Sequence, residues 1–185
     1  APVEVAGIAF CLLLGAVLFI PNFKVVLANG VTRKIYFLTN LLSAVIIAAI
    51  FAFFDLFVIK THSLFLKIHS FSEWYYPQTG WVWFLLWHFS LYLSLLMLGR
   101  LIILALYRSS TRLKWAISLS PLWGFILLWM LNVQLDDSVI YFLIEYNRWS
   151  RSYPQAVPVQ LVYAATAAGL IYLLLRRAPV KTEGE

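Results

Sequence analysis

Few side chains in this chain are of a type that binds metals or performs catalysis, and they are scattered along it. The imidazole and thiol groups are those of His62, His69, His88 and Cys11. His62 and His69 lie seven residues apart and can share a helical face, so a surface metal site is one reading; ordinary interfacial histidines are the favoured one. Cys11 alone builds neither a disulfide nor a cysteine metal site. No metal site is expected.

Polar side chains inside apolar stretches are the second group of candidates, because burying them in a bilayer is costly and usually functional. The candidates for a polar substrate path are Asn40, Asp55, His88, Arg100 and Asn132. Structural roles are favoured for all of them. Asp55 is predicted to reach the outer interface or to pair with Lys60, and Arg100 to extend its guanidinium to the inner surface. The others, with Ser90 and Ser94, are predicted to form hydrogen bonds between helices.

Motifs of soluble enzymes are missing from the sequence. It has no Gly-x-x-x-x-Gly-Lys-Ser/Thr loop, so the chain does not bind ATP through a P-loop. It also lacks His-Glu-x-x-His, Gly-x-Ser-x-Gly and Cys-x-x-Cys. A haem held by paired histidines at membrane depth is not supported either, because His88 alone lies well inside an apolar stretch. We therefore predict a chain without catalytic residues or a bound cofactor.

The composition places these residues in a membrane protein. Hydrophobic residues make up 63% and charged residues 12% of the 185 residues, and the mean hydropathy is +0.85. A soluble domain of this size is nearer half apolar and a quarter charged. The formal net charge is +6, but the basic residues are spread between apolar runs. That distribution is typical of membrane topology control and not of nucleic-acid binding.

Apolar runs predict an all-α, polytopic transmembrane bundle of about five spans, since barrel strands would alternate with a period of two. The predicted spans are 5–20, 35–59, 81–107, 113–133 and 157–175. Small residues recur every fourth position on two of them, which favours close helix packing. They are Ala44, Ala48, Ala52, Ala164, Ala165, Ala168 and Gly169.

Charge alternates between the connectors and predicts an orientation. The segments 21–34 and 108–114 and the tail are basic, whereas 60–80 and 134–156 hold acidic and aromatic residues. The positive-inside rule therefore predicts an external N-terminus and a cytoplasmic C-terminus. An external N-terminus without a signal sequence predicts a six-span fold that lacks its first helix here. Segments 60–80 and 134–156 are predicted to be external amphipathic or re-entrant segments. For segment 134–156, an outer cap with no functional role remains the alternative.

The connector 21–34 has more local signals than a turn requires. Pro21 is predicted to end or kink the first span. Apolar residues then follow at helical spacing and predict a short amphipathic helix across the membrane face. Asn29-Gly30 predicts the end of that helix, and Thr32 the N-cap of the next span. The alternative is a basic loop that happens to carry an aromatic residue.

The stretch FKVVLANGVTRKIYFLTNLLSAVIIAAI resembles the segment of bacterial type-two ABC exporter permeases that runs from the coupling helix into the next span. The tail YLLLRRAPVKTEGE resembles the end of small Gram-positive permeases of this kind. In that family the coupling helix follows the second of six spans and the re-entrant helices lie before the last. Both features come one span early here, as loss of the first helix would cause.

The resemblance implies a transporter subunit of a multi-pass bacterial plasma membrane protein. A separate ATP-binding subunit would bind ATP and Mg, and a second permease copy or paralogue would complete the assembly within the lipid bilayer. The residues implied to form or flank the coupling element are Phe23, Lys24, Leu27, Asn29, Gly30, Arg33 and Lys34. An amphiphilic, peptide or lipid-like cargo is expected. A stand-alone membrane immunity or sensor protein, or a membrane-embedded enzyme or redox subunit, remains the alternative.

Overall fold

A computed structural model describes residues 2–17, 19–65, 80–110, 114 and 153–176. Every regular element within these ranges is an α-helix, so the prediction of an all-α fold is confirmed. The helices are α1 (Pro2–Val17), α2 (Phe19–Ala28), α3 (Arg33–Phe65), α5 (Trp81–Arg108) and α8 (Tyr153–Arg176). The predicted span 113–133 and most of the segments 60–80 and 134–156 lie outside the described residues.

Three of these helices have the length and apolar composition needed to cross a membrane. They contain the stretches Arg33–Val58, Trp81–Arg108 and Gln155–Arg176, of 26, 28 and 22 residues. A shorter apolar stretch, Gly7–Val17, lies in α1. Large apolar side chains such as Leu42, Ile50 and Phe57 are exposed on the outside of α3, where a bilayer would cover them. The chain is therefore a membrane protein built on a helical bundle.

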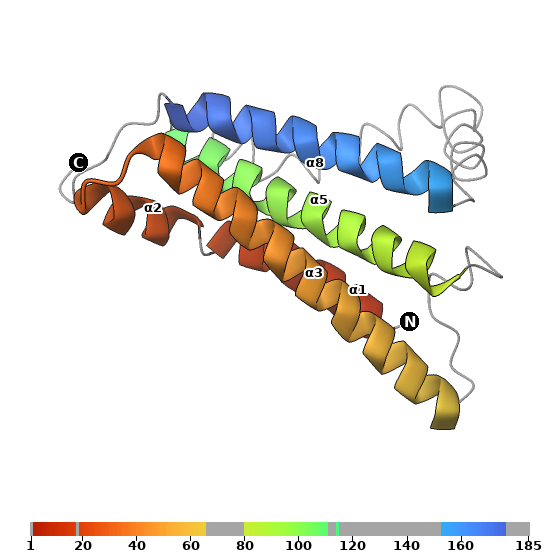
Figure 1. Cartoon of the computed structure of the whole chain (residues 1–185). Coiled ribbons are helices and arrows are strands. Elements are labelled where there is room, and N and C mark those ends of the chain that lie inside the picture. Colours follow the sequence, from red (N-terminus) through yellow and green to blue (C-terminus); the bar gives the residue numbers. More distant parts are fainter. Residues whose placement is uncertain (1, 18, 66–79, 111–113, 115–152, 177–185) are drawn as a thin grey trace, which may run out of the picture.

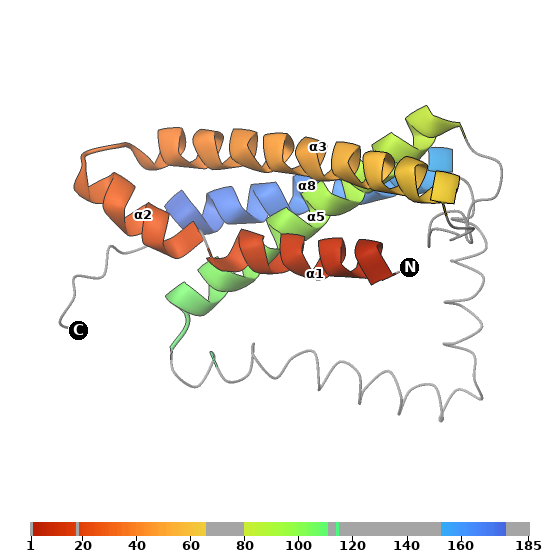
Figure 2. The same ribbon diagram turned by 90° about the horizontal axis from the view of Figure 1, so that it is seen from below.

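α5 is the central helix and packs against α1, α3 and α8. Figures 1 and 2 show that α3 begins at the end of the bundle where α5 and α8 finish. We call this the basic end, defined by Arg33, Lys34, Arg108, Lys114 and Arg176. The structure thus gathers basic residues from three connectors that charge alternation assigned to one side of the membrane.

Helix boundaries differ from the predictions at three places. Pro21 was predicted to end or kink the first span; α1 ends at Val17 and Pro21 is the third residue of α2, so the chain changes direction just before Pro21 (Figures 1 and 2). Proline is tolerated there since the first-turn N–H groups have no partner within the helix. α3 continues through 60–65, which the prediction placed outside the span, because no glycine or proline interrupts it. α8 likewise begins at Tyr153, with its first proline also in the first turn.

Close backbone contact between α1 and α5 holds the centre of the bundle together. A Cβ atom on Gly15 would lie 2.4 Å from the carbonyl oxygen of Leu96, and one on Gly99 would lie 2.3 Å from that of Leu12. Only glycine fits at such distances, so a glycine of α1 packs against the backbone of α5 and a glycine of α5 packs against the backbone of α1. The alanines predicted for close packing on α3, at 44, 48 and 52, are fully buried as well.

Candidate functional site

The turn between α2 and α3 is held by backbone hydrogen bonds that require a glycine. The Gly30 N–H donates to Leu27 O at 3.0 Å and the Val31 N–H to Val26 O at 3.2 Å, the paired bonds of a Schellman motif. Gly30 has a φ of 79°, which L-residues with a Cβ adopt only at a cost. The predicted helix end at Asn29-Gly30 is therefore confirmed.

Thr32 caps the following helix, as its position predicts. The Ile35 N–H donates to Thr32 Oγ1 at 3.4 Å, and the Tyr36 N–H donates to Thr32 O at 3.0 Å. These contacts satisfy N–H groups that a helix start leaves without a partner. The direction of α3 relative to α2 is therefore set by two adjacent local motifs.

Three aromatic side chains anchor α2 to the bundle. Phe23 is 0% exposed, and its ring centroid lies 5.3 Å from that of Tyr36 on α3 and 6.3 Å from that of Tyr107 on α5. The Tyr36 hydroxyl also donates to Phe19 O at 2.5 Å, where α2 begins. A shift of α2 would disturb packing with both α3 and α5, so movements of the three helices are coupled through these rings.

The described residues on the opposite face of α2, and those of its turn at Asn29 and Gly30, are exposed. Figures 1 and 2 show α2 leaving α1 obliquely and extending past the ends of α5 and α8. Val25 is 61% exposed on this segment, and Asn22, Ala28, Asn29 and Gly30 are exposed too. The end of α2 thus projects beside the basic end, and its described exposed residues are uncharged.

The residues expected to form the coupling element divide into two groups. Asn29, Gly30 and Lys34 are exposed, whereas Phe23 is buried and serves as the anchor. Leu27 and Arg33 are half-buried, and Lys24 belongs to α2 with its side chain outside the described part. Sequence reasoning missed Val25 as the outward apolar residue. Its helical position opposite Phe23 would have indicated it once the buried face was known.

Two arginines tie the end of α8 to its neighbours. Arg33 Nη1 on α3 donates to Arg176 O at 2.7 Å, and Arg108 Nη1 on α5 donates to Leu174 O at 2.9 Å. The last carbonyl groups of a helix have no partner within it and carry the negative end of its dipole. Both arginines therefore stabilise α8, and through Arg33 its end is linked directly to the turn after α2.

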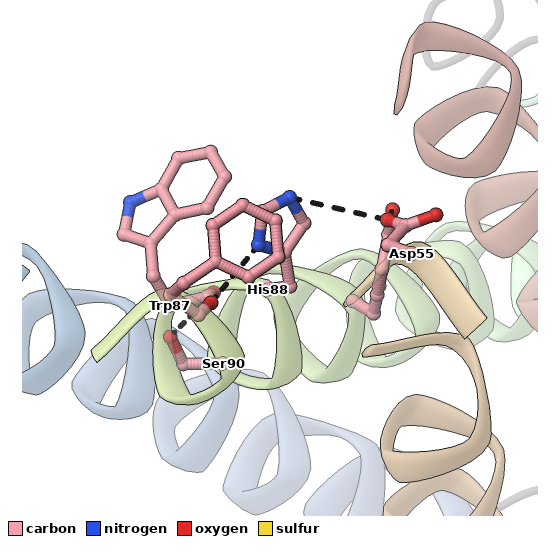
Figure 3. A network of polar contacts seen from close by, with 6 residues as sticks. Asp55, Trp87, His88 and Ser90 are labelled. Atoms are coloured by element: carbon pink, nitrogen blue, oxygen red, sulfur yellow. Dashed lines mark hydrogen bonds and ion pairs between the residues drawn. The ribbon is translucent and has the colours of Figure 1, made fainter. Parts of the chain in front are cut away.

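Asp55 and His88 form a buried polar contact between α3 and α5 (Figure 3). Asp55 is 3% exposed and accepts a hydrogen bond from the Tyr92 hydroxyl. His88 Nε2 lies 3.9 Å from Asp55 Oδ2, and His88 Nδ1 donates to Phe84 O at 2.9 Å. Asp55 does not extend to the membrane interface, one of its two predicted roles, because Tyr92 and His88 on the central helix supply partners inside the bundle. The other predicted role, a pair with Lys60, involves a side chain outside the described residues.

Arg100 is also buried, at 7% exposure, and does not extend to the inner surface as predicted. Its guanidinium donates to Asn40 O and, at 3.2 Å, to Ser43 Oγ. The Asn40 side chain was expected to bond between helices, but its Nδ2 donates to Tyr36 O within α3. The interhelical contact at this depth is thus made by Arg100 to the backbone of α3.

Ser90 and Ser94 join α5 to α8, as predicted. The Ser90 hydroxyl contacts Gln160 Oε1 and lies 3.0 Å from Trp87 O (Figure 3), and Ser94 Oγ donates to Gln160 O at 2.8 Å. Asn132 and His69 lie outside the described residues, as does the side chain of His62. Within the described ranges no three histidine, cysteine or acidic side chains gather as metal ligands.

Comparison with known proteins gives no identification. No family model matches the chain, and neither a curated protein nor a solved structure resembles it significantly. Its function must therefore be inferred from its residues and their geometry.

Proposed function

We propose that this chain is the membrane-spanning permease subunit of an ATP-binding-cassette exporter of the type-two class. In this proposal α2 and the turn after it dock against a separate ATP-binding subunit, which supplies ATP hydrolysis with Mg. A second permease copy or paralogue completes the transporter in a bacterial plasma membrane. The cargo is an amphiphilic, peptide or lipid-like molecule that is moved past the bundle.

One observation carries this proposal: α2 projects from the bundle, with aromatic residues packed on one side and exposed residues on the other. The buried rings of Phe23, Tyr36 and Tyr107 connect it to α3 and α5, while Val25 and the turn at Gly30 face away from the bundle. A remote ligand can bias a two-state bundle only through a contact that differs between the two states. An anchored projection at the basic end provides such a contact.

The Asp55 and Arg100 contacts support a role in which α3 and α5 move together. Asp55 is bonded to Tyr92, and Arg100 to the backbone and a hydroxyl of α3. These groups hold α3 against α5 at two depths, so force received by α3 reaches the central helix. In this proposal the chain itself contributes no catalytic residue, and ATP hydrolysis takes place in the partner subunit.

Replacing Gly30 by valine tests the proposal. No atom lies within 4 Å of a Cβ at this position, but the φ of 79° penalises any β-branched residue, by about 1–2 kcal/mol. We expect the turn to rearrange and binding of the ATP-binding subunit to weaken by about 5- to 30-fold. The measurements are the amount of ATPase that copurifies with the tagged chain and the ATP hydrolysis rate of the complex in proteoliposomes.

Gly80→Val is the matched control, because Gly80 also has open space around its Cβ but an ordinary φ of −63°. It should leave copurification and hydrolysis unchanged. Equal behaviour of the Gly30 and Gly80 variants would argue against docking through this turn.

A further inference from the structure

An apolar groove, formed by a cavity that α3, α5 and α8 line, lies next to the place where α3 and α8 meet at the basic end. The two helices meet there, where Arg33 Nη1 donates to Arg176 O and the rings of Phe37 and Tyr172 lie 5.2 Å apart. Figure 1 shows that α3 and α8 diverge away from this contact, with α5 between them. Beyond the ring contact lies a cavity of about 410 Å³.

Among the residues that the structure describes, those lining the cavity are all apolar. Leu41 of α3, Met97 of α5, and Leu161, Ala165 and Ala168 of α8 are on its walls. The alanines make a recess in α8, because longer side chains at these positions would fill it. An apolar recess open to the bilayer suits a hydrocarbon chain, since a polar ligand would lose its hydrogen bonds there.

Basic residues lie at the mouth of the groove, at the basic end. Helical spacing places Lys34 and Arg33 one turn before Phe37, and Arg176 one turn after Tyr172. Lys34 and Arg176 are exposed, and one nitrogen of Arg33 is used by Arg176 O. Asp55, in the other half of α3, is the only acidic side chain that the structure describes. The described part of this end thus offers positive charge with no acidic side chain to neutralise it.

We propose that the groove binds one anionic phospholipid from the leaflet at the basic end. Its phosphate lies against Lys34 and Arg176, and one acyl chain passes over Phe37 and Tyr172 into the recess beside Ala165. Charge at the mouth and an apolar wall above it match the two halves of such a lipid. This lipid site does not rest on docking to an ATPase, although Lys34 also flanks the expected coupling element, and a bound lipid would hold α3 and α8 at a fixed separation.

The charge requirement is tested by native mass spectrometry of the purified full chain in detergent. Phosphatidylglycerol and phosphatidylcholine with the same acyl chains are titrated in parallel. We expect tighter binding of phosphatidylglycerol, and Lys34→Gln and Arg176→Gln should each weaken it by about fivefold. Phosphatidylcholine should be affected little. Equal affinities for the two lipids, or unchanged phosphatidylglycerol binding in both variants, would overturn the assignment.

The groove requirement is tested by filling the recess. Ala165→Phe should reduce phosphatidylglycerol binding at least as much as a charge variant, whereas Val162→Phe, at a position 64% exposed and not lining the cavity, should not. Glycerol phosphate should fail to compete, because it has no chain to bury. Competition by glycerol phosphate, or full binding by Ala165→Phe, would rule out the groove. Disulfide formation between two copies of Ala165→Cys would show that a second chain covers it instead.

Discussion

Replacing Phe23 by alanine should detach α2 from the bundle while the long helices stay packed. The ring is fully buried between Tyr36 and Tyr107, and truncation of a buried phenylalanine costs about 3–5 kcal/mol. α2 also packs through Phe19, Val26 and Leu27, but it is the shortest of the described helices, so the loss should appear as local opening. Since each 1.4 kcal/mol is a factor of ten, α2 amides should exchange at least about a hundredfold faster.

Hydrogen exchange followed by mass spectrometry measures this change helix by helix. Peptides covering 19–30 should lose protection, and peptides from α8 should not. Phe57→Ala is the control, because Phe57 is an exposed residue of α3. Retained protection of α2 in the Phe23 variant would contradict the anchoring role. A uniform loss across all helices would show that Phe23 belongs to the global core.

A second large effect is expected where α1 crosses α5. Gly99→Ala and Gly15→Ala place a Cβ within 2.3 and 2.4 Å of facing carbonyl oxygens, so the helices must separate. Overpacking of this kind costs about 1–3 kcal/mol. For a chain of this size the melting temperature should fall by about 2 to 12 °C.

Gly169→Ala provides the comparison within the same bundle, since nothing lies within 4 Å of a Cβ there. Alanine should be neutral or slightly stabilising at that position, because it favours helix more than glycine does. Thermal unfolding in one detergent, monitored by circular dichroism, ranks the three variants. A melting temperature for the Gly99 variant equal to that of the Gly169 variant would disprove backbone contact between α1 and α5.

Local features of the fold were predictable because they depend on neighbouring residues. The span 81–107 corresponds to α5, and the roles of Gly30 and Thr32 follow from turn and capping chemistry alone. For Pro21 the sequence predicted an end or a kink of the first span but not its exact position, because a proline in the first turn of a helix and one at the end of a helix give the same local signal.

Contacts between helices were much less predictable. Asp55 and Arg100 were expected at the membrane surfaces because the partners that hold them inside, Tyr92 and the backbone near Asn40, are distant in sequence. Gly15 and Gly99 lie on different helices and form no spacing pattern together. Likewise, Val25 is recognisable as an outward residue only after the buried face of α2 is known. For each of these residues the local sequence allowed more than one role, and the contacts between helices determine which one it has.

Site-specific photo-crosslinking from Val25 tests the coupling role most directly. p-Benzoylphenylalanine is placed there in native membranes, and crosslinked polypeptides are identified by peptide sequencing. The same group at Phe57, an exposed residue in the half of α3 that is farther from α2, serves as the reference position. From position 25 we predict a crosslinked adduct with a protein that contains a P-loop. From position 57 we predict no adduct with that protein. An adduct with lipid alone at position 25, or the same P-loop protein from both positions, would contradict docking of an ATPase on α2.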